Sequence, residues 1–272
     1  LLVFGASFSN HTGITEKRPT IQVDFDLMTL GRFHAIDVPV WGEIGVTAQA
    51  LSDDFLGDMW TQDQTADIQS RKAIWREETA HCINDSHANS INTALLFEVL
   101  SDVVDDDAII TVDTSNHASS FACHFNCQEQ SILMPGHSHS LGFAFPAAMG
   151  AWSATQEYDS KFSDKQVVCI TDNDGLEQHL DQINTAVKYG MNITCIVLSN
   201  GEARKMNHEL SITNWDNKPV NLHNASLSDY ADLCGALGLH VSTVSELNAA
   251  LKQALTHSGP ALLEVVTSTA PV

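Results

Sequence analysis

The chain has 272 residues, enough for one large domain preceded by part of another. Its formal net charge is −21, with 34 acidic and 13 basic residues, which argues against nucleic acid as a partner because phosphate binding needs a basic surface. No apolar run approaches the roughly 18 residues that a membrane-spanning helix requires, so we expect no membrane partner. The opening apolar run has no basic region before it, and it does not begin with Met. We therefore expect no signal peptide, and we expect a processed chain, a fragment or a missing start.

The six cysteines are scattered and do not form the pattern of a disulfide framework. Cys169 and Cys195 lie in apolar runs, where a thiol behaves as a small hydrophobic group. The sequence therefore predicts the cytoplasm or another reducing compartment. Cys123, His124 and Cys127 resemble half of a zinc site, but no second pair of ligands follows them, so we favour a surface loop.

The first part of the chain predicts part of a small α/β unit. Residues 1–4 and 20–25 have the composition of strands, and residues 45–56 that of a short helix. Residues 57–88 are polar with few apolar anchors, which predicts a linker with a helix inside it. We therefore expect a partial domain at 1–56 before this linker.

From residue 89 the pattern alternates between helices and strands, which predicts a doubly wound α/β domain with a parallel sheet over 89–272. Two continuous apolar runs, 166–171 and 192–198, are typical of strands buried on both faces. The helix expected between them, 179–189, completes a right-handed βαβ unit. The other expected elements are strands at 108–112 and 260–267 and helices at 89–104, 141–155, 228–237 and 245–257.

In an open α/β sheet, ligands bind beside the carboxyl ends of the strands. One loop at such an end contains Asp172 and Asp174, a carboxylate pair that acid–base chemistry could use. Solvated acids at the mouth of a pocket are the simpler interpretation. The loops expected at this edge of the sheet are 113–120, 135–142, 171–178 and 199–205.

These loops resemble segments of the thiamine-diphosphate enzyme family of the pyruvate oxidase and acetolactate synthase type, in the same order and with similar spacing. The segments VFGASFSNHTGI, IQVDFD and LGRFHAIDVPVWGEIG are similar to the second half of that family's central domain. Flavin-containing members bind FAD there, but we do not expect FAD in this chain, although Asp24 and Asp26 match acids near the adenosine pocket. The resemblance does not extend to the family's N-terminal domain, which supplies the catalytic glutamate.

The family signature for the cofactor is GDG, followed about two dozen residues later by NN; a carboxylate and an amide oxygen bind Mg²⁺, which bridges to the diphosphate. The glycines let the backbone approach the phosphates, and the next helix points its N-terminus at them. Matched without gaps, the signature falls on Asp172, Asn173 and Asp174, and later on Ser199 and Asn200. Both glycines are then acidic, and the aspartate that binds the metal is an amide.

A shift of one residue instead places the signature on Asn173, Asp174 and Gly175 and recovers an Asp-Gly pair. We favour the match without gaps, because the shift needs a deletion before the following helix. The resemblance then implies a degenerate metal site formed by Asn173, Asn200 and the carbonyl of Glu202.

The other loops keep part of the family pattern. Ser115 replaces a family glycine, whereas Asn116 and His117 remain; His139 replaces a glycine whose carbonyl meets the aminopyrimidine, and Leu141 matches the apolar residue that supports the bent cofactor. His117 could be catalytic, but a packed remnant of the family loop is the favoured interpretation, so we predict no catalytic residue. The resemblance implies cofactor contacts at Asn116, His117, His139, Leu141, Asn173, Asp174 and Gly175.

The replacements oppose binding of the diphosphate. At an effective dielectric constant of about 20, each close pair of like charges costs on the order of 4 kcal/mol. A micromolar affinity amounts to only about 8 kcal/mol. We therefore expect weak or no binding of thiamine diphosphate and Mg²⁺.

The sequence leaves more than one function open. The favoured hypothesis is a degenerate family protein retained for its fold and for association in a homo-oligomer or larger complex. The alternative is an active subunit of a pyruvate oxidase-like or acetolactate synthase-like enzyme that decarboxylates a 2-oxo acid, with its N-terminal catalytic part on a separate chain. A changed ligand without a diphosphate is a third hypothesis.

Overall fold

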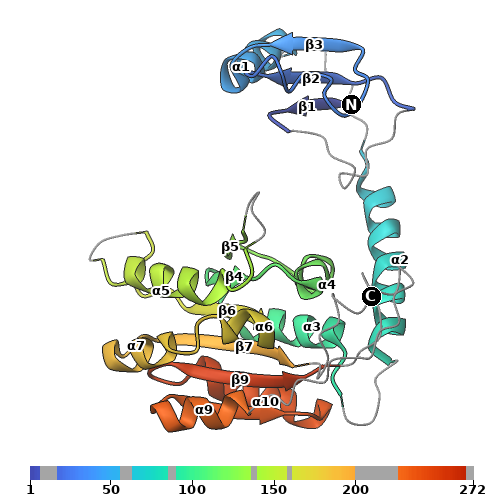
Figure 1. Ribbon diagram of the computed structural model, residues 1–272. Helices are drawn as coiled ribbons and strands as arrows, with labels where there is room; N and C mark the ends of the chain where they lie inside the picture. Colours follow the sequence, from blue (N-terminus) through green and yellow to red (C-terminus); the bar gives the residue numbers. More distant parts are fainter. Residues whose placement is uncertain are drawn as a thin grey trace, which may run out of the picture. The chain divides into compact units, whose positions relative to one another are not determined.

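The computed structural model describes residues 1–6, 17–55, 63–84, 90–135, 140–157, 161–199 and 226–267, with the backbone alone at 78–84 and 116 (Figure 1). The chain divides into two compact units, Leu1–Gln69 and Ser70–Val272. The finer boundaries expected from the sequence, 1–56, 57–88 and 89–272, stay a prediction. Of the helices that the structure describes, none is both long and apolar enough to cross a membrane.

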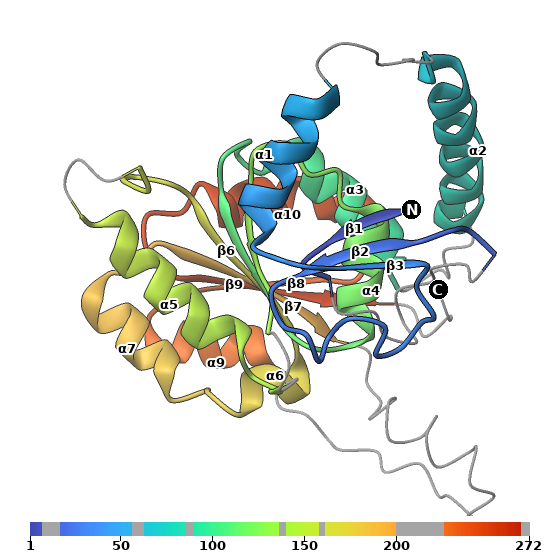
Figure 2. The ribbon, with the colours of Figure 1, turned by 90° about the horizontal axis from the view of Figure 1, so that it is seen from above.

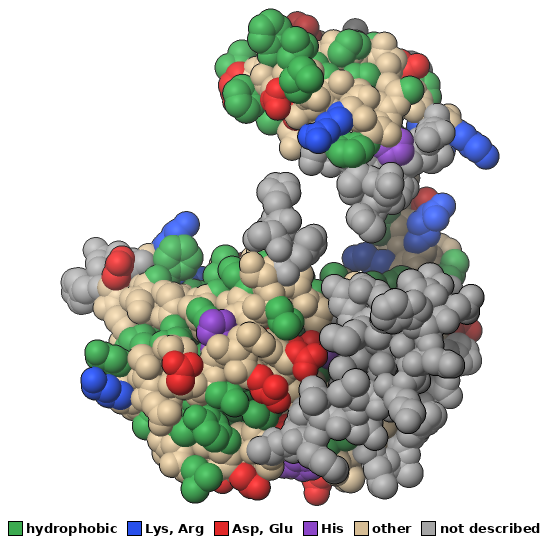
Figure 3. All heavy atoms as spheres, in the orientation of Figure 1, with side chains coloured by type: hydrophobic (Ala, Val, Ile, Leu, Met, Phe, Trp, Pro, Cys, Tyr) green, Lys and Arg blue, Asp and Glu red, His purple; other side chains and the backbone are tan. Residues whose placement is uncertain are grey.

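The first unit contains a three-stranded parallel sheet in the order β1-β2-β3. Its elements are β1 (Leu2–Phe4), β2 (Ile21–Asp24), β3 (Val38–Trp41) and α1 (Ile44–Phe55). β3 was not predicted because Pro39 interrupts its pattern; an edge strand tolerates proline, since one side of it makes no ladder hydrogen bonds. Among the described side chains of this unit, Val23 is the only buried hydrophobic one, and many apolar side chains reach its surface (Figure 3).

The second unit is built on a six-stranded parallel sheet in the order β5-β4-β6-β7-β9-β8. β6 and β7 are almost entirely buried at its centre, and β9 lies between β7 and β8 although it follows both in the chain. The predicted fold class is confirmed. The strands are β4 (Ile109–Val112), β5 (Ser131–Leu133), β6 (Val167–Asp172), β7 (Ile193–Ser199), β8 (Leu237–Val241) and β9 (Ala261–Val266).

Helices cover both faces of this sheet (Figure 2). One core cluster joins the sheet to α3, α4 and α10, with Phe121 edge-on to Phe97 and stacked on Phe125. The opposite cluster joins it to α5, α6, α7 and α9. The helices are α2 (Thr65–Asn84), α3 (Thr93–Val103), α4 (Asn116–His124), α5 (Ala144–Thr155), α6 (Asn173–Glu177), α7 (Gln182–Tyr189), α9 (Leu227–Cys234) and α10 (Val244–Leu255).

The expected helix at 228–237 is too long. It ends at Cys234 because Gly235 adopts a left-handed conformation (φ 90°), and the chain then enters β8. α4, β5 and α6 were also not predicted as elements; all three are nine residues or shorter, so their periodicity is weak.

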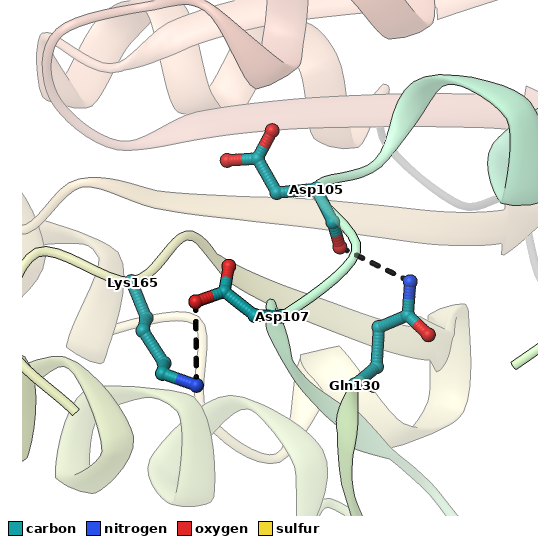
Figure 4. A network of polar contacts seen from close by, with 4 residues as sticks. All are labelled: Asp105, Asp107, Gln130 and Lys165. Carbon is teal, nitrogen blue, oxygen red and sulfur yellow. Dashed lines mark hydrogen bonds and ion pairs between the residues drawn. The ribbon is translucent and has the colours of Figure 1, made fainter. Parts of the chain in front are cut away.

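A polar network ties the turns at the amino ends of β4, β5 and β6 together (Figure 4). Lys165 Nζ lies 3.4 Å from Asp107 Oδ2, and Gln130 Nε2 donates to the Asp105 carbonyl at 3.1 Å. The Asp105 amide in turn donates to Gln166 Oε1 at 3.1 Å. Since an exposed ion pair contributes little to stability, we interpret the network as fixing these turns. The carboxyl ends of the same strands, where ligands bind in open α/β sheets, lie at the opposite edge.

Candidate functional site

Three adjacent strands of the second unit end at one edge of the sheet. Asp113 directly follows β4, β6 ends at Asp172 and β7 ends at Ser199. β4 pairs with β6, and β6 pairs with β7, so the loops that follow them are neighbours. This is the edge at which the sequence predicts a ligand site.

Asp113 is the most connected side chain at this edge. It is 1% exposed, and its carboxylate accepts hydrogen bonds from the amides of Thr114 (2.9 Å), Gly142 (3.0 Å) and Phe143 (3.3 Å) and from Thr171 Oγ1 (3.0 Å). These four donors satisfy a buried charge. Asp113 thereby joins the loop after β4 to the turn before α5 and to the end of β6.

Asp172 caps the short helix α6 with its own side chain. Its carboxylate accepts a hydrogen bond from the Gly175 amide at 2.8 Å, which satisfies one of the free donors at the helix start. Burial raises the pKa of the Asp172 carboxyl group to about 6; this hydrogen bond opposes the rise, and the nearby charges of Asp174 and Asp113 add to it. Burial therefore makes ionisation of the Asp172 carboxyl group costly.

Gly175 lies tightly against these acids. A Cβ atom added there would lie 2.5 Å from Thr171 Oγ1 and 2.6 Å from Asp113 Oδ2. Both distances are shorter than van der Waals contact, so the position requires glycine. Gly142, with φ 83°, is similarly constrained, because a Cβ atom there would lie 2.9 Å from two ring atoms of His179.

Of the three predicted metal ligands, Asn173 is the one that lies among the described residues. Its side chain is 6% exposed, and its Nδ2 donates to Ser199 Oγ at 3.3 Å. Its Oδ1 atom is buried and has no hydrogen-bond partner in the described structure. A buried amide oxygen without a donor is a suitable ligand for a hard cation. Asp174, in the same turn, is exposed.

The other predicted residues divide into two groups. Asn116 and His117 begin α4, where Ser115 Oγ accepts a hydrogen bond from the His117 amide at 3.2 Å, and Leu141 is 45% exposed beside Gly142. The roles predicted for these residues stay predictions. His139, Asn200 and Glu202 lie outside the described residues.

Asp113, Thr171 and His179 were not predicted from the sequence as site residues. An acid immediately after a buried strand is a signal that could have pointed to Asp113. The zinc alternative at Cys123, His124 and Cys127 gains no support, because the described part of the chain contains no metal-binding group of three such side chains.

His124 instead has a packing role. Its ring stacks on Trp75 at a centroid distance of 6.3 Å. Burial lowers the pKa of His124, so its neutral form is favoured.

Comparison with known proteins identifies the family of the domain that contains this sheet. Residues 113–265 match the family described as thiamine pyrophosphate enzyme, C-terminal TPP binding domain. This match spans more than half of the chain, which therefore belongs to that family, as the sequence predicted. Thiamine pyrophosphate is another name for thiamine diphosphate.

Particular relatives support the same family. The chain is 22% identical to the acetolactate synthase large subunit of Haemophilus influenzae, covering 86% of this chain and 40% of that protein. It is 25% identical to the acetolactate synthase isozyme 1 large subunit of Escherichia coli, covering 97% and 46%. A solved structure, the thiamine diphosphate-dependent 4-hydroxybenzoylformate decarboxylase of Rhodococcus jostii, shares the fold with a TM-score of 0.67 and 22% identity, covering 93% and 45%. The chain thus spans less than half the length of these proteins.

Proposed function

We propose that this chain is a degenerate member of the thiamine diphosphate enzyme family, with weak or lost cofactor binding and a structural or assembly role. One observation carries the proposal. In the match without gaps, Asp172 replaces the first glycine of the diphosphate turn, and its carboxylate bonds to the Gly175 amide at 2.8 Å. An acidic oxygen therefore occupies a donor at the turn where the family places phosphate oxygens.

The described residues do not fit a diphosphate. Asp172 and Asp113 both lie against Gly175, and a third acid, Asp174, immediately precedes Gly175 in the chain. A phosphate group brought to this turn would meet carboxylates, each at a cost on the order of 4 kcal/mol if ionised. Protonating Asp172 would relieve part of that cost, but it would leave the Gly175 amide occupied.

A cation fits the described residues better than a diphosphate does. The orphan Oδ1 of Asn173 supports a ligand role, whereas the carboxylate that the family offers at this position is absent. A neutral amide attracts Mg²⁺ less strongly than a carboxylate does. Asn200 and Glu202, the other expected ligands, stay predictions.

The assembly role is part of the same proposal. Relatives of this chain include proteins named as large subunits, and we propose a homo-oligomer or larger complex, with a separate N-terminal subunit as one partner. Five described cysteines are free thiols, which supports a reducing compartment such as the cytoplasm. The charge of −21 speaks against nucleic acid as a partner.

Isothermal titration with thiamine diphosphate and Mg²⁺ tests the proposal. We expect no saturable binding by the natural chain at up to about 100 µM cofactor, a concentration that would reveal any affinity near −6 kcal/mol or stronger. The triple reversal Asp172→Gly, Asn173→Asp and Asp174→Gly should bind measurably more tightly. Asp181→Asn, which removes one exposed charge before α7, is the control and should gain nothing. A low-micromolar dissociation constant for the natural chain would refute the proposal.

The orphan Asn173 oxygen favours a second candidate function, an active subunit of a 2-oxo acid decarboxylating enzyme resembling pyruvate oxidase or acetolactate synthase. In that case the cofactor would supply the carbanion chemistry, and Asn116, Leu141, Asn200 and Glu202 would help to hold it, together with Asn173. The catalytic glutamate would come from a separate chain. Native mass spectrometry of the protein purified from its source distinguishes the two: cofactor mass together with a companion subunit supports this alternative.

A further inference from the structure

The turn after β6 is closed by the chain's own carboxylates. We infer that Asp172 is a built-in substitute for the cofactor diphosphate, and that Asp113 is a positioning residue that clamps the turn to its neighbours, so that the start of α6 and the residues just before α5 are held in place without any cofactor. The inference rests on the proposed loss of the diphosphate, and it goes further by naming what replaces it.

Asp172 supplies the acceptor that the start of α6 needs. Its Oδ1 accepts the Gly175 amide at 2.8 Å, and the next residue, Leu176, is fully buried against the sheet. The helix is only five residues long, so it gains little from its own ladder and depends on its cap and on this anchor. An external anion would have to displace a side chain that is already covalently in place.

Asp113 closes the turn from the other side. Through its Oδ2 it accepts Thr171 Oγ1 at 3.0 Å, and Thr171 immediately precedes the capping residue Asp172. A single added carbon at Gly175 already lies 2.6 Å from Asp113 Oδ2. A phosphate group is larger than that carbon, so it has no room on this side of Gly175 while both acids keep their positions.

The same carboxylate holds the neighbouring loop. Asp113 accepts the Gly142 and Phe143 amides, which lie just before α5. His179 packs against Gly142, whose missing side chain leaves room for the imidazole ring. The turn before α5 is therefore held twice, once by Asp113 and once by His179, which follows α6.

Native-state hydrogen exchange on the full, cofactor-free chain tests the inference. In the natural protein we expect the Gly175 amide to be protected. Loss of a cap costs about 1 kcal/mol, so the Gly175 amide should exchange about fivefold faster in Asp172→Ala than in Asp172→Asn, which also lacks the buried charge. Asp172→Asn retains a capping oxygen and should exchange no faster than the natural protein. Asp181→Asn is the control.

A second variant tests the clamp without removing a buried charge. Thr171→Val deletes the hydroxyl donor to Asp113 and keeps the branched shape. We expect faster exchange at the Gly175, Gly142 and Phe143 amides than in the natural chain, by about fivefold for the loss of one such hydrogen bond.

Two results would overturn the inference: equal exchange at Gly175 in Asp172→Ala and Asp172→Asn, or natural exchange at all three amides in Thr171→Val. These measurements use no cofactor. Failure of the proposed function would appear instead as tight cofactor binding in the calorimetric titration, so the two failures are distinguishable.

Discussion

The raised pKa of Asp172 predicts an unusual effect of pH on stability. Its folded-state pKa is about 6, against an ordinary value of 3.8, a difference of about two units or about 3 kcal/mol. Between these values the folded chain binds a proton more readily than the unfolded chain does. The stabilising effect of protonation is therefore complete below the unfolded pKa, falls as the pH rises, and is lost above about 6.

The substitution Asp172→Asn isolates this effect, because the amide keeps a capping oxygen and cannot ionise. We expect the variant to be more stable than the natural protein at pH 8 by up to about 3 kcal/mol. For the natural protein, about half of the proton-linked stability is lost between pH 5 and pH 8. The advantage of the variant should therefore shrink by about half at pH 5.

Thermal unfolding followed by circular dichroism between pH 5 and pH 8 is the assay. A difference of 3 kcal/mol corresponds to roughly 6–12 °C in the midpoint for a unit of this size. Asp181→Asn, which changes the same charge at an exposed position, should leave the pH dependence unchanged. Equal midpoints at pH 8, or an advantage that does not depend on pH, would show that burial of Asp172 is not costly.

Three other perturbations follow from packing and charge at the same edge. Gly175→Ala should destabilise the chain by roughly 1–3 kcal/mol in urea unfolding, because its methyl group would overlap the oxygens that lie 2.5–2.6 Å away. Gly150→Ala is its control: it lies within α5 with nothing near the added carbon, so it should stabilise by about 0.5–1 kcal/mol, and equal effects at both positions would contradict the packing argument. Leu176→Ala, at a fully buried position, should cost roughly 2–5 kcal/mol, whereas Leu233→Ala, at a side chain 86% exposed, should change stability by about 0.5 kcal/mol or less. In calorimetry, the triple reversal at 172–174 should gain affinity for thiamine diphosphate. The absence of any gain would show that residues other than 172–174 prevent cofactor binding.

The sequence predicted the parts of the fold that depend on continuous hydrophobic runs. The central strands were expected at 166–171 and 192–198, and they lie at Val167–Asp172 and Ile193–Ser199. It missed β8, because Gly235 ends a helix and a strand begins two residues later without a polar spacer. Local pattern does not reveal such a change when only Gly235 and Ala236 separate the helix from the strand.

The sequence predicted that the loops after β4, β6 and β7 are neighbours at one edge of the sheet, but it did not predict how their side chains are connected. Asn173 and Ser199, which the family signature selects, do meet at the sheet edge. Asp113 escaped notice because its partners Gly142 and Thr171 are 29 and 58 residues away in the sequence. Only the strand order brings these donors to Asp113, and the order of strands in a sheet cannot be predicted from a single segment of the sequence.

The position of β9 has a consequence for how the second unit is made. A chain growing from its amino end completes β7 and β8 before β9, yet β9 lies between them and pairs with both. While residues 261–266 are still inside the ribosome, β7 exposes an open edge and β8 has no described neighbour to pair with. A nascent chain stalled at that stage presents the open edge of β7 and the unpaired strand β8, and chaperone capture should therefore be strongest just before β9 emerges.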